Sequence, residues 1–193
     1  MATLHTSAKV AVSARSPTSA ARSADAGPRT REVLVFELGG QRYGLPTADV
    51  RELVRAVAIT PLPNAPAAIE GVVNVRGRVL PVLDVRARFR LPAKALDLSD
   101  HFIVASAGAR GVILRVDRAT HLALIDEASV QPPQTLGPSA TYVAGVAKLD
   151  DGLVLIHDLT TFLSAAEAAS LDEALLAHHG RIETALMSRA VTC

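Results

Sequence analysis

IEGVVNVRGRVLPVLD, residues 69–84, is the stretch of this chain that decides its fold. It contains two apolar runs, residues 72–75 and 79–83, on either side of Arg76-Gly77-Arg78. Short runs rich in β-branched residues around a glycine are typical of two strands joined by a tight turn. We therefore predict a β-hairpin in which Gly77 adopts the positive φ of the turn and the flanking arginines remain in water.

The same pattern returns later in the chain, in VAGVAKLDDGLVLIHD, residues 143–158. Equivalent positions carry residues of the same type, and both stretches end in an aspartate, Asp84 in the first and Asp158 in the second. Each copy is preceded by a strand pattern that begins near a glycine, and then by a proline-rich segment that ends the strand. A repeat of this length indicates that one β unit has been used twice, which predicts a mainly β protein built from two small barrels.

Strand patterns also precede and separate the two hairpins, and helical spacing follows them. Residues 31–38 alternate as a strand does, Gly39-Gly40 predicts a hairpin turn into residues 41–45, and residues 50–59 fit a half-exposed strand. Residues 85–90 fit either a strand edge or a helical turn. Ser164 to Glu167 fits a capping box, so we expect a helix up to Gly180 and a second helical piece after it.

Composition narrows the classes of protein that the chain can represent. Its net charge of +1 argues against strong nonspecific attraction to nucleic acid or to acidic membranes. Cys193 is the only cysteine, which excludes an internal disulfide framework and a thiolate metal cluster and fits a reducing cytoplasm. No run approaches the roughly 18 to 20 apolar residues of a membrane span, so direct membrane insertion is not expected. Residues 1–30, rich in Ala, Ser, Thr and Arg, predict a disordered tail, with an organelle transit peptide as the alternative.

Aspartates and histidines are the residues that invite a catalytic or metal-binding interpretation. Asp84 and Asp158 can be interpreted as an acid/base pair, but equivalent aspartates after two hairpins can also cap the turns that follow. His157 and His178-His179 invite a metal site. Adjacent histidines on a helix point about 100° apart, however, and no second set completes a site. We therefore predict packed or solvated histidines, and no catalytic, cofactor or metal site.

A cluster of arginines near the first hairpin suggests a binding function. Its members are Arg76, Arg78, Arg86, Arg88 and Arg90. Small barrels can bind oligonucleotides, so nucleic-acid binding is kept as the alternative function, although only Tyr43 and Phe89 lie near enough to stack on bases. Two barrels side by side also leave a groove, and apolar grooves with a few polar anchors bind proteins. The residues therefore favour a protein-interaction module over an enzyme.

The order of these motifs resembles the CheW family of chemotaxis coupling proteins. The matching segments lie within residues 32–163 and read GQRYGLPTADVREL, TPLPNAP, IEGVVNVRGRVLPVLDVRARF, GVILRVDRA and VAGVAKLDDGLVLIHDLTTFL. The string NVRGRVLPVLDVR is the most specific of them. The resemblance implies two intertwined five-stranded SH3-like β-barrels in residues 31–163, with subdomains at roughly 44–90 and 100–158. A helical C-terminal tail over residues 164–193 follows.

The resemblance also implies a function and a set of contact residues. Family members are non-enzymatic adaptors that link the cytoplasmic hairpin tip of methyl-accepting receptors to a CheA-type histidine kinase, whose regulatory domain is similar to them. A cytoplasmic protein recruited to membrane receptor arrays is therefore expected, with no cofactor and no nucleic acid partner. By position, the family's contacts fall on Val50, Glu52 and Gly71, and Arg76 occupies the arginine of the family's turn motif. Asn74 and Asp84 belong to the same motif and either bind or hold its shape, and a structural contact of Arg76 across the hairpin is the alternative.

Three residues depart from the pattern that the resemblance implies. Arg90 stands where the family commonly has glycine, Arg115 interrupts a strand that is usually all apolar, and His157 replaces a usual aliphatic residue. We expect these departures to alter the surface of the second barrel and therefore the choice of partner.

Overall fold

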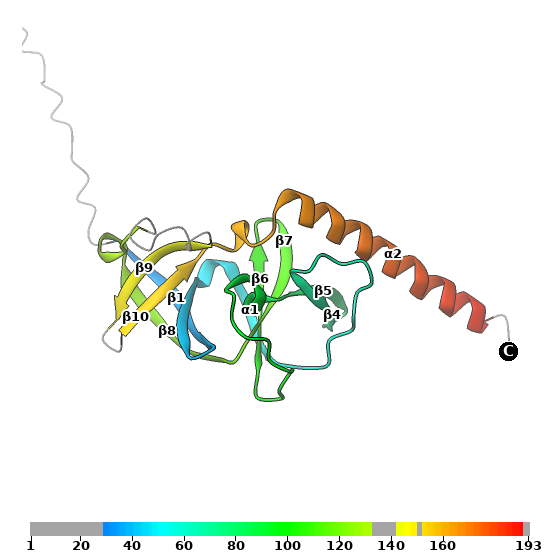
Figure 1. Cartoon of the computed structure of the whole chain (residues 1–193), viewed down its shortest axis with the longest axis horizontal. Helices are drawn as coiled ribbons and strands as arrows, with labels where there is room; N and C mark the ends of the chain where they lie inside the picture. The colour runs from blue at the N-terminus through cyan, green and yellow to red at the C-terminus, as the bar shows by residue number, and fades with distance from the viewer. Residues whose placement is uncertain (1–28, 133–141, 150–151, 191–193) are drawn as a thin grey trace, which may run out of the picture.

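Ten strands form two five-stranded sheets in the part of the chain that this computed structural model describes, residues 29–132, 142–149 and 152–190 (Figure 1). The strands are β1 (Thr30–Leu38), β2 (Gln41–Pro46), β3 (Val50–Arg55), β4 (Ile69–Val75), β5 (Arg78–Leu83), β6 (His101–Ala107), β7 (Arg110–Val116), β8 (Arg118–Asp126), β9 (Val143–Leu149) and β10 (Gly152–His157). Helical segments include η1 (Thr47–Asp49), α1 (Val85–Arg88), η2 (Glu127–Ser129), η4 (Leu159–Thr161) and α2 (Ala165–Ala190). The predicted mainly β fold with a C-terminal helix is confirmed.

The two halves of the chain exchange strands between the sheets. Sheet A has the order β8-β1-β2-β10-β9, and sheet B has the order β3-β6-β7-β5-β4. The exchanged hairpins join through parallel pairs, β2 with β10 and β5 with β7, whereas the other neighbours are antiparallel. The barrels are therefore intertwined, as predicted. The sheets divide the chain differently from the expected ranges 44–90 and 100–158, because each half contributes its first hairpin to the barrel of the other half.

One further bridge links the ends of each sheet. Thr60, beyond β3, exchanges backbone hydrogen bonds of 2.8 and 2.9 Å with Val72 in β4. Gln131, beyond β8, makes two hydrogen bonds of 2.9 Å with Val146 in β9. Because the two bridges occupy corresponding places in the two repeats, the equivalence that the sequence predicts extends to the closure of the barrels.

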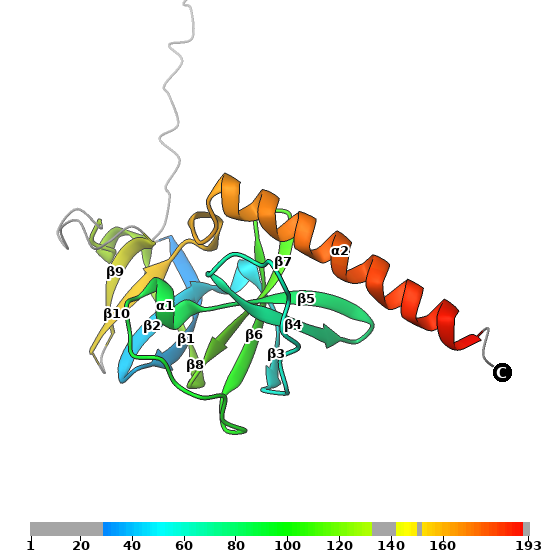
Figure 2. The ribbon, with the colours of Figure 1, turned by 45° about the vertical axis from the view of Figure 1, so that its right-hand side comes forward.

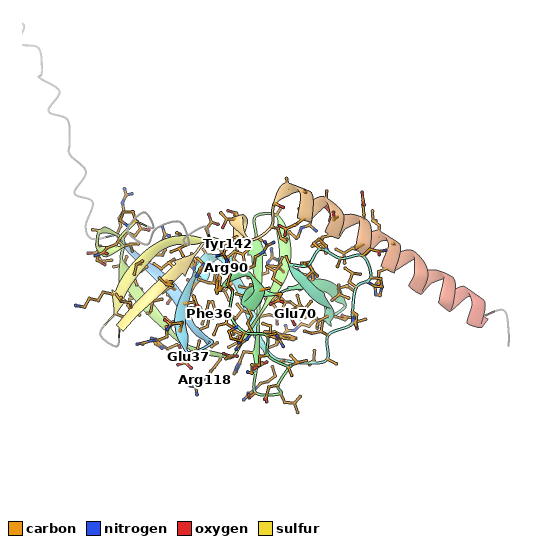
Figure 3. All side chains as sticks on the ribbon, in the orientation of Figure 1. Phe36, Glu37, Glu70, Arg90, Arg118 and Tyr142 are labelled. Carbon is orange, nitrogen blue, oxygen red and sulfur yellow. The ribbon has the colours of Figure 1, made fainter. Side chains whose placement is uncertain are left out.

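Successive side chains along a central strand point to opposite faces of the sheet and pack into two different cores. In β1, Val33 and Val35 belong to the core of their own barrel, whereas Leu34, Phe36 and Leu38 belong to a cluster that also contains residues of sheet B. We call this the central cluster, and Phe36 lies in it at the junction of the two barrels (Figure 3). Strands that are buried on both faces are apolar throughout. That burial explains the near-continuous apolar runs of the sequence.

The C-terminal helix α2 is anchored on the central cluster and then extends past the barrels. Leu159 of η4, Phe162 directly after it, and Leu171 and Ala174 of α2 are buried in this cluster. The helix continues through Gly180 to Ala190, so the two helical pieces that the sequence suggested are one helix (Figure 2). A glycine inside a helix costs only about 1 kcal/mol relative to alanine, which does not force a break.

The predicted capping box begins this helix. The Glu167 backbone N–H donates to Ser164 Oγ at 3.2 Å, and the Ser164 backbone N–H donates to Glu167 Oε2 at 2.9 Å. Two backbone donors of the first turn are thus satisfied by side chains. In the described residues, no helix is both long and apolar enough to cross a membrane.

Other expectations are settled or corrected by the structure. The half-exposed strand expected over residues 50–59 ends at Arg55. Residues 85–88 form a helical turn, α1, and not a strand edge. The predicted disordered tail lies outside the described residues up to residue 28, and β1 already begins at Thr30.

Candidate protein-binding site

Glu52 and Arg76 are the two predicted contact residues that the fold brings together. Glu52 lies on β3, and Arg76 lies at the tip of the β4–β5 hairpin with a φ of 50°. Arg76 Nη2 is 3.0 Å from Glu52 Oε2, and the side chains are 80% and 28% exposed, respectively. The contact is therefore between the hairpin and β3, and not across the hairpin. An exposed ion pair of this kind contributes at most about 1 kcal/mol, so Arg76 can turn toward a partner at little cost.

The carboxylate of Glu52 retains capacity for a further partner. Its Oε2 atom is buried, and its approach to Arg76 lacks the geometry of a hydrogen bond. Arg76 compensates the charge of this atom, but a donor from another protein with hydrogen-bond geometry would satisfy it more completely.

Asn74 and Gly71 shape the hairpin. The Gly77 backbone N–H donates to Asn74 Oδ1 at 2.8 Å, and Gly77 has the predicted positive φ, at 83°. Gly71 has a φ of 153°, and a Cβ there would lie 2.3 Å from the carbonyl oxygen of Thr60. Only glycine allows the two backbones to approach this closely. Val50 is half-buried against the central cluster at the start of β3.

Asp84 and Asp158 both cap the segment that follows their hairpin. Asp84 Oδ1 accepts a 2.9 Å hydrogen bond from the backbone N–H of Ala87 at the start of α1. Asp158 Oδ1 accepts one of 2.9 Å from the backbone N–H of Thr160 in η4. The capping interpretation therefore accounts for both aspartates. Asp84 follows the end of β5 remote from the hairpin tip, so the fold does not place it beside Arg76.

The arginine cluster does not form one basic surface. Arg86 is buried, and its Nη2 donates to both carboxylate oxygens of Asp117, at 2.7 and 2.8 Å. Arg88 is mostly buried and donates to Glu167 Oε1 at 2.5 Å. Because these cations are paired inside the molecule and Arg76 is paired with Glu52, the cluster does not offer the continuous positive groove that a nucleic acid backbone needs.

Three leucines that the sequence analysis did not single out are exposed on β3 and β8. Leu53 on β3, Leu122 and Leu124 on β8 are 44%, 56% and 70% exposed, and we call them the leucine face. Leu53 pairs with Ile103 and Leu122 pairs with Leu34, and both partners belong to the central cluster. Directly opposed residues in a sheet share one face, so these leucines continue the central cluster to the surface.

The leucine face draws on both barrels. β8 belongs to sheet A and contacts β6 of sheet B, which pairs with β3 (Figure 2). The alternation of Leu122 and Leu124 in residues 118–126 was the available sequence signal. It shows that one side of the strand is apolar, but not whether another part of the chain covers that side.

The departures at Arg115 and His157 lie inside the molecule and not on the surface of a barrel, contrary to expectation. Arg115 is buried in β7, forms an ion pair of 3.1 Å with Glu70 and donates from Nη2 to the carbonyl oxygen of Lys94 at 3.0 Å. Burial raises the pKa of Glu70, while the charge of Arg115 acts to lower it. These contacts explain how a charged residue is tolerated in an otherwise apolar strand.

His157 is packed among aromatic rings. It is 2% exposed, its ring stacks on Phe89 at 4.5 Å between centroids, and its Nδ1–H donates to the carbonyl oxygen of Tyr142 at 2.7 Å. Burial lowers the pKa of His157 to about 4, so the ring is neutral near pH 7. In the described residues, no group of three or more His, Cys, Asp or Glu side chains is placed to hold a metal ion.

Comparisons with known proteins identify a shared domain. A family model described as a CheW-like domain matches residues 32–167. The protein "Chemotaxis protein CheW" of Treponema pallidum is 27% identical over 146 residues, which are 72% of this chain and 86% of that protein. "Protein FrzA" of Myxococcus xanthus is 35% identical over 130 residues, 66% of this chain and 80% of that protein. The crystal structure of scaffolding protein TtCheW from Thermoanaerobacter tengcongensis superposes with a TM-score of 0.62 at 33% identity, covering 67% of this chain and 89% of that one.

Proposed function

Because this chain belongs to the CheW-like family of chemotaxis scaffold proteins, we propose that it is a non-enzymatic adaptor that couples methyl-accepting chemoreceptors to a CheA-type histidine kinase. The observation that carries the proposal is an exposed apolar face to which both barrels contribute. The adaptor acts on the cytoplasmic side of receptor arrays and holds two other proteins at fixed positions.

The leucine face is the proposed contact for the helical tip of the receptor. Amphipathic helices bind by laying their apolar stripe on an exposed apolar surface. Leu122 and Leu124 lie two residues apart on one side of β8, and Leu53 lies on β3, which pairs with β6, the strand of sheet B that β8 contacts. The proposed helix would lie across these strands. Burying such leucines contributes about 25 cal/mol for each Å² of apolar area removed from water.

The tip of the β4–β5 hairpin is the proposed contact for the regulatory domain of the kinase. Arg76 is exposed there, and Glu52 has an acceptor atom without a hydrogen bond. Val50 lies at the start of the same strand as Glu52, while Asn74 and Gly71 hold the hairpin in shape. Asp84 supports the end of the hairpin by capping α1.

Calorimetric titration with a receptor-tip fragment and with a kinase regulatory domain tests both contacts. We expect Leu122→Glu to weaken receptor binding by at least tenfold, because it places a charge in an apolar contact. Leu153→Glu is the matched control, since Leu153 is also exposed in sheet A, by 64%, but lies on β10. Arg76→Ala should weaken kinase binding and leave the fold intact by circular dichroism.

The outcomes separate the functions. A wild-type chain that binds neither fragment would overturn the adaptor function. Equal losses for Leu122→Glu and Leu153→Glu would remove the leucine face from the receptor contact. Unchanged binding of both fragments by Arg76→Ala would remove Arg76 from the site, and loss of folding would assign it a structural role.

A further inference from the structure

Asp117 is the one residue between β7 of sheet B and β8 of sheet A, so it lies where the chain passes from one barrel to the other. Its carboxylate accepts hydrogen bonds from Arg86 Nη2, from Lys94 Nζ at 2.9 Å and from the backbone N–H of Gly39 at 2.7 Å. The Asp117 backbone N–H donates to the carbonyl oxygen of Glu37 at 3.0 Å. Three other parts of the chain, namely the β1–β2 hairpin, α1 and the segment before β6, therefore meet at Asp117.

The groups around Asp117 belong to both barrels. Gly39 and Glu37 come from the β1–β2 hairpin of sheet A, while Arg86 is in α1, which follows β5 of sheet B. Lys94 lies in the segment before β6 of sheet B. Arg118, the next residue, adds an ion pair of 3.0 Å with Glu37, and the two side chains lie together in Figure 3.

Each cation at this junction is held by a second contact. Arg86 Nη1 donates to the carbonyl oxygen of Pro92 at 3.0 Å, and Lys94 Nζ donates to Asp100 Oδ1 at 2.6 Å. Asp100 is almost completely buried. Burial on its own raises the pKa of Asp117, but the hydrogen bonds from Arg86, Gly39 and Lys94 outweigh it and lower that pKa to about 2. Asp117 is therefore charged near neutral pH. Because Arg86 and Lys94 are each held by a second contact, they cannot move away from Asp117 without breaking that contact as well.

These hydrogen bonds can fix the angle between the two barrels, which the apolar packing of the central cluster cannot do. Apolar packing is non-directional, so it holds the barrels together without selecting a single angle between them. Charge-assisted hydrogen bonds are directional, and here one arginine nitrogen donates to both oxygens of the carboxylate while a lysine and a backbone N–H also donate to it. Their position at the crossing between the sheets means that a rotation of one barrel against the other would break them.

We propose that Asp117 is a positioning residue that fixes the orientation of the two barrels and thereby the affinity of the leucine face for a helix that contacts both. The inference rests on the proposed function, because it assigns the leucine face to a helical partner. β8, which carries Leu122 and Leu124, begins directly after Asp117, whereas Leu53 belongs to the other barrel. A change in barrel orientation therefore alters the spacing of the three leucines, but leaves the Glu52 and Arg76 contact inside sheet B unchanged.

Asp117→Asn tests the inference in the full-length chain. We expect binding of a receptor-tip fragment to weaken about tenfold, because the two halves of its contact are no longer preorganised. Binding of the kinase regulatory domain at the hairpin tip should stay within about twofold. Residual dipolar couplings measured by NMR on both barrels should report a changed or broadened orientation. A residue that only supports stability would weaken both ligands alike and leave the orientation of the folded fraction unchanged.

Two further variants keep the experiment decisive. Lys94→Gln removes the cation that Asp117 shares with Asp100 and leaves the buried Arg86 pair intact. It carries the test if Asp117→Asn does not fold, and the same selective loss at smaller size is expected for its folded fraction. Arg110→Gln is the control, because it breaks a bidentate ion pair of 2.6 and 2.7 Å with Asp172 that ties β7 to α2 and not to the other barrel.

The inference fails if the dipolar couplings and the receptor affinity of the folded variants equal those of the wild type, or if Arg110→Gln produces the same selective loss. A wild-type chain that binds no receptor fragment would instead overturn the proposed function. In that case the dipolar couplings still decide whether Asp117 orients the barrels.

Discussion

Replacing His157 with leucine should remove a large part of the acid sensitivity of this protein. The folded state holds His157 neutral, with its Nδ1–H bound to Tyr142 and its Nε2 buried without a hydrogen-bond partner. Burial lowers its pKa from 6.5 to about 4, which corresponds to about 3 kcal/mol of stability. This stability is fully present above pH 6.5. It is lost as the pH falls toward 4, because the unfolded chain takes up the proton first.

Urea denaturation at pH values from 7.5 to 4.5 measures the effect, using the difference between variant and wild type at each pH. Near neutral pH we expect His157→Leu to stay within about 1 kcal/mol of the wild type, because leucine loses the hydrogen bond to Tyr142 but also removes the buried Nε2 that has no partner. At the acid end the variant should be more stable than the wild type by about 2 to 3 kcal/mol. His121→Gln, at an exposed histidine on β8, is the control and should follow the wild type. Parallel curves for His157→Leu and the wild type would refute the reasoning.

Backbone and capping positions give the remaining predictions, all measured by urea denaturation. Arg90→Gly should stabilise the protein by about 0.5 to 1 kcal/mol, because residue 90 ends α1 with a φ of 56°, whereas Ala87→Gly inside the helix should destabilise it. Gly71→Ala should cost at least about 2 kcal/mol, since its Cβ would lie 2.3 Å from a backbone oxygen, and a stable variant would contradict the packing described. Asp84→Ala and Asp158→Ala should each cost about 1 kcal/mol as lost caps, and unequal costs would argue against their equivalence.

The backbone at Arg90 explains why glycine would suit this position. The family resemblance predicts glycine at this position, and here the Leu91 N–H donates to the Arg86 carbonyl at 2.9 Å while the Arg90 N–H donates to that of Ala87 at 3.2 Å. These two hydrogen bonds form a Schellman motif, whose left-handed residue is usually glycine. The departure at Arg90 is therefore a strained helix end.

Local features of this protein were readable from the amino-acid sequence. The hairpin around Gly77, the capping box at Ser164 and the equivalence of Asp84 and Asp158 all depend on residues within a few positions of one another. Such features need only a turn residue, a side-chain acceptor or an apolar period, and each of these is visible in a short stretch of sequence. The repeat then identified the two units, because two copies of a local pattern can be compared directly.

Only the tertiary structure decided which strands pair and which apolar faces remain exposed. Leu34 and Leu122 are residues of the same type and lie opposite one another in neighbouring strands, yet one is 8% exposed and the other 56%. Arg86 and Arg90 belong to one run of arginines, but of the two only Arg86 is buried and donates a hydrogen bond to Asp117. The period of apolar residues shows that one face of a strand is apolar, but whether that face is buried depends on a segment far away in the chain. The exchange of hairpins between the barrels decides which apolar faces are buried and which remain exposed for a partner.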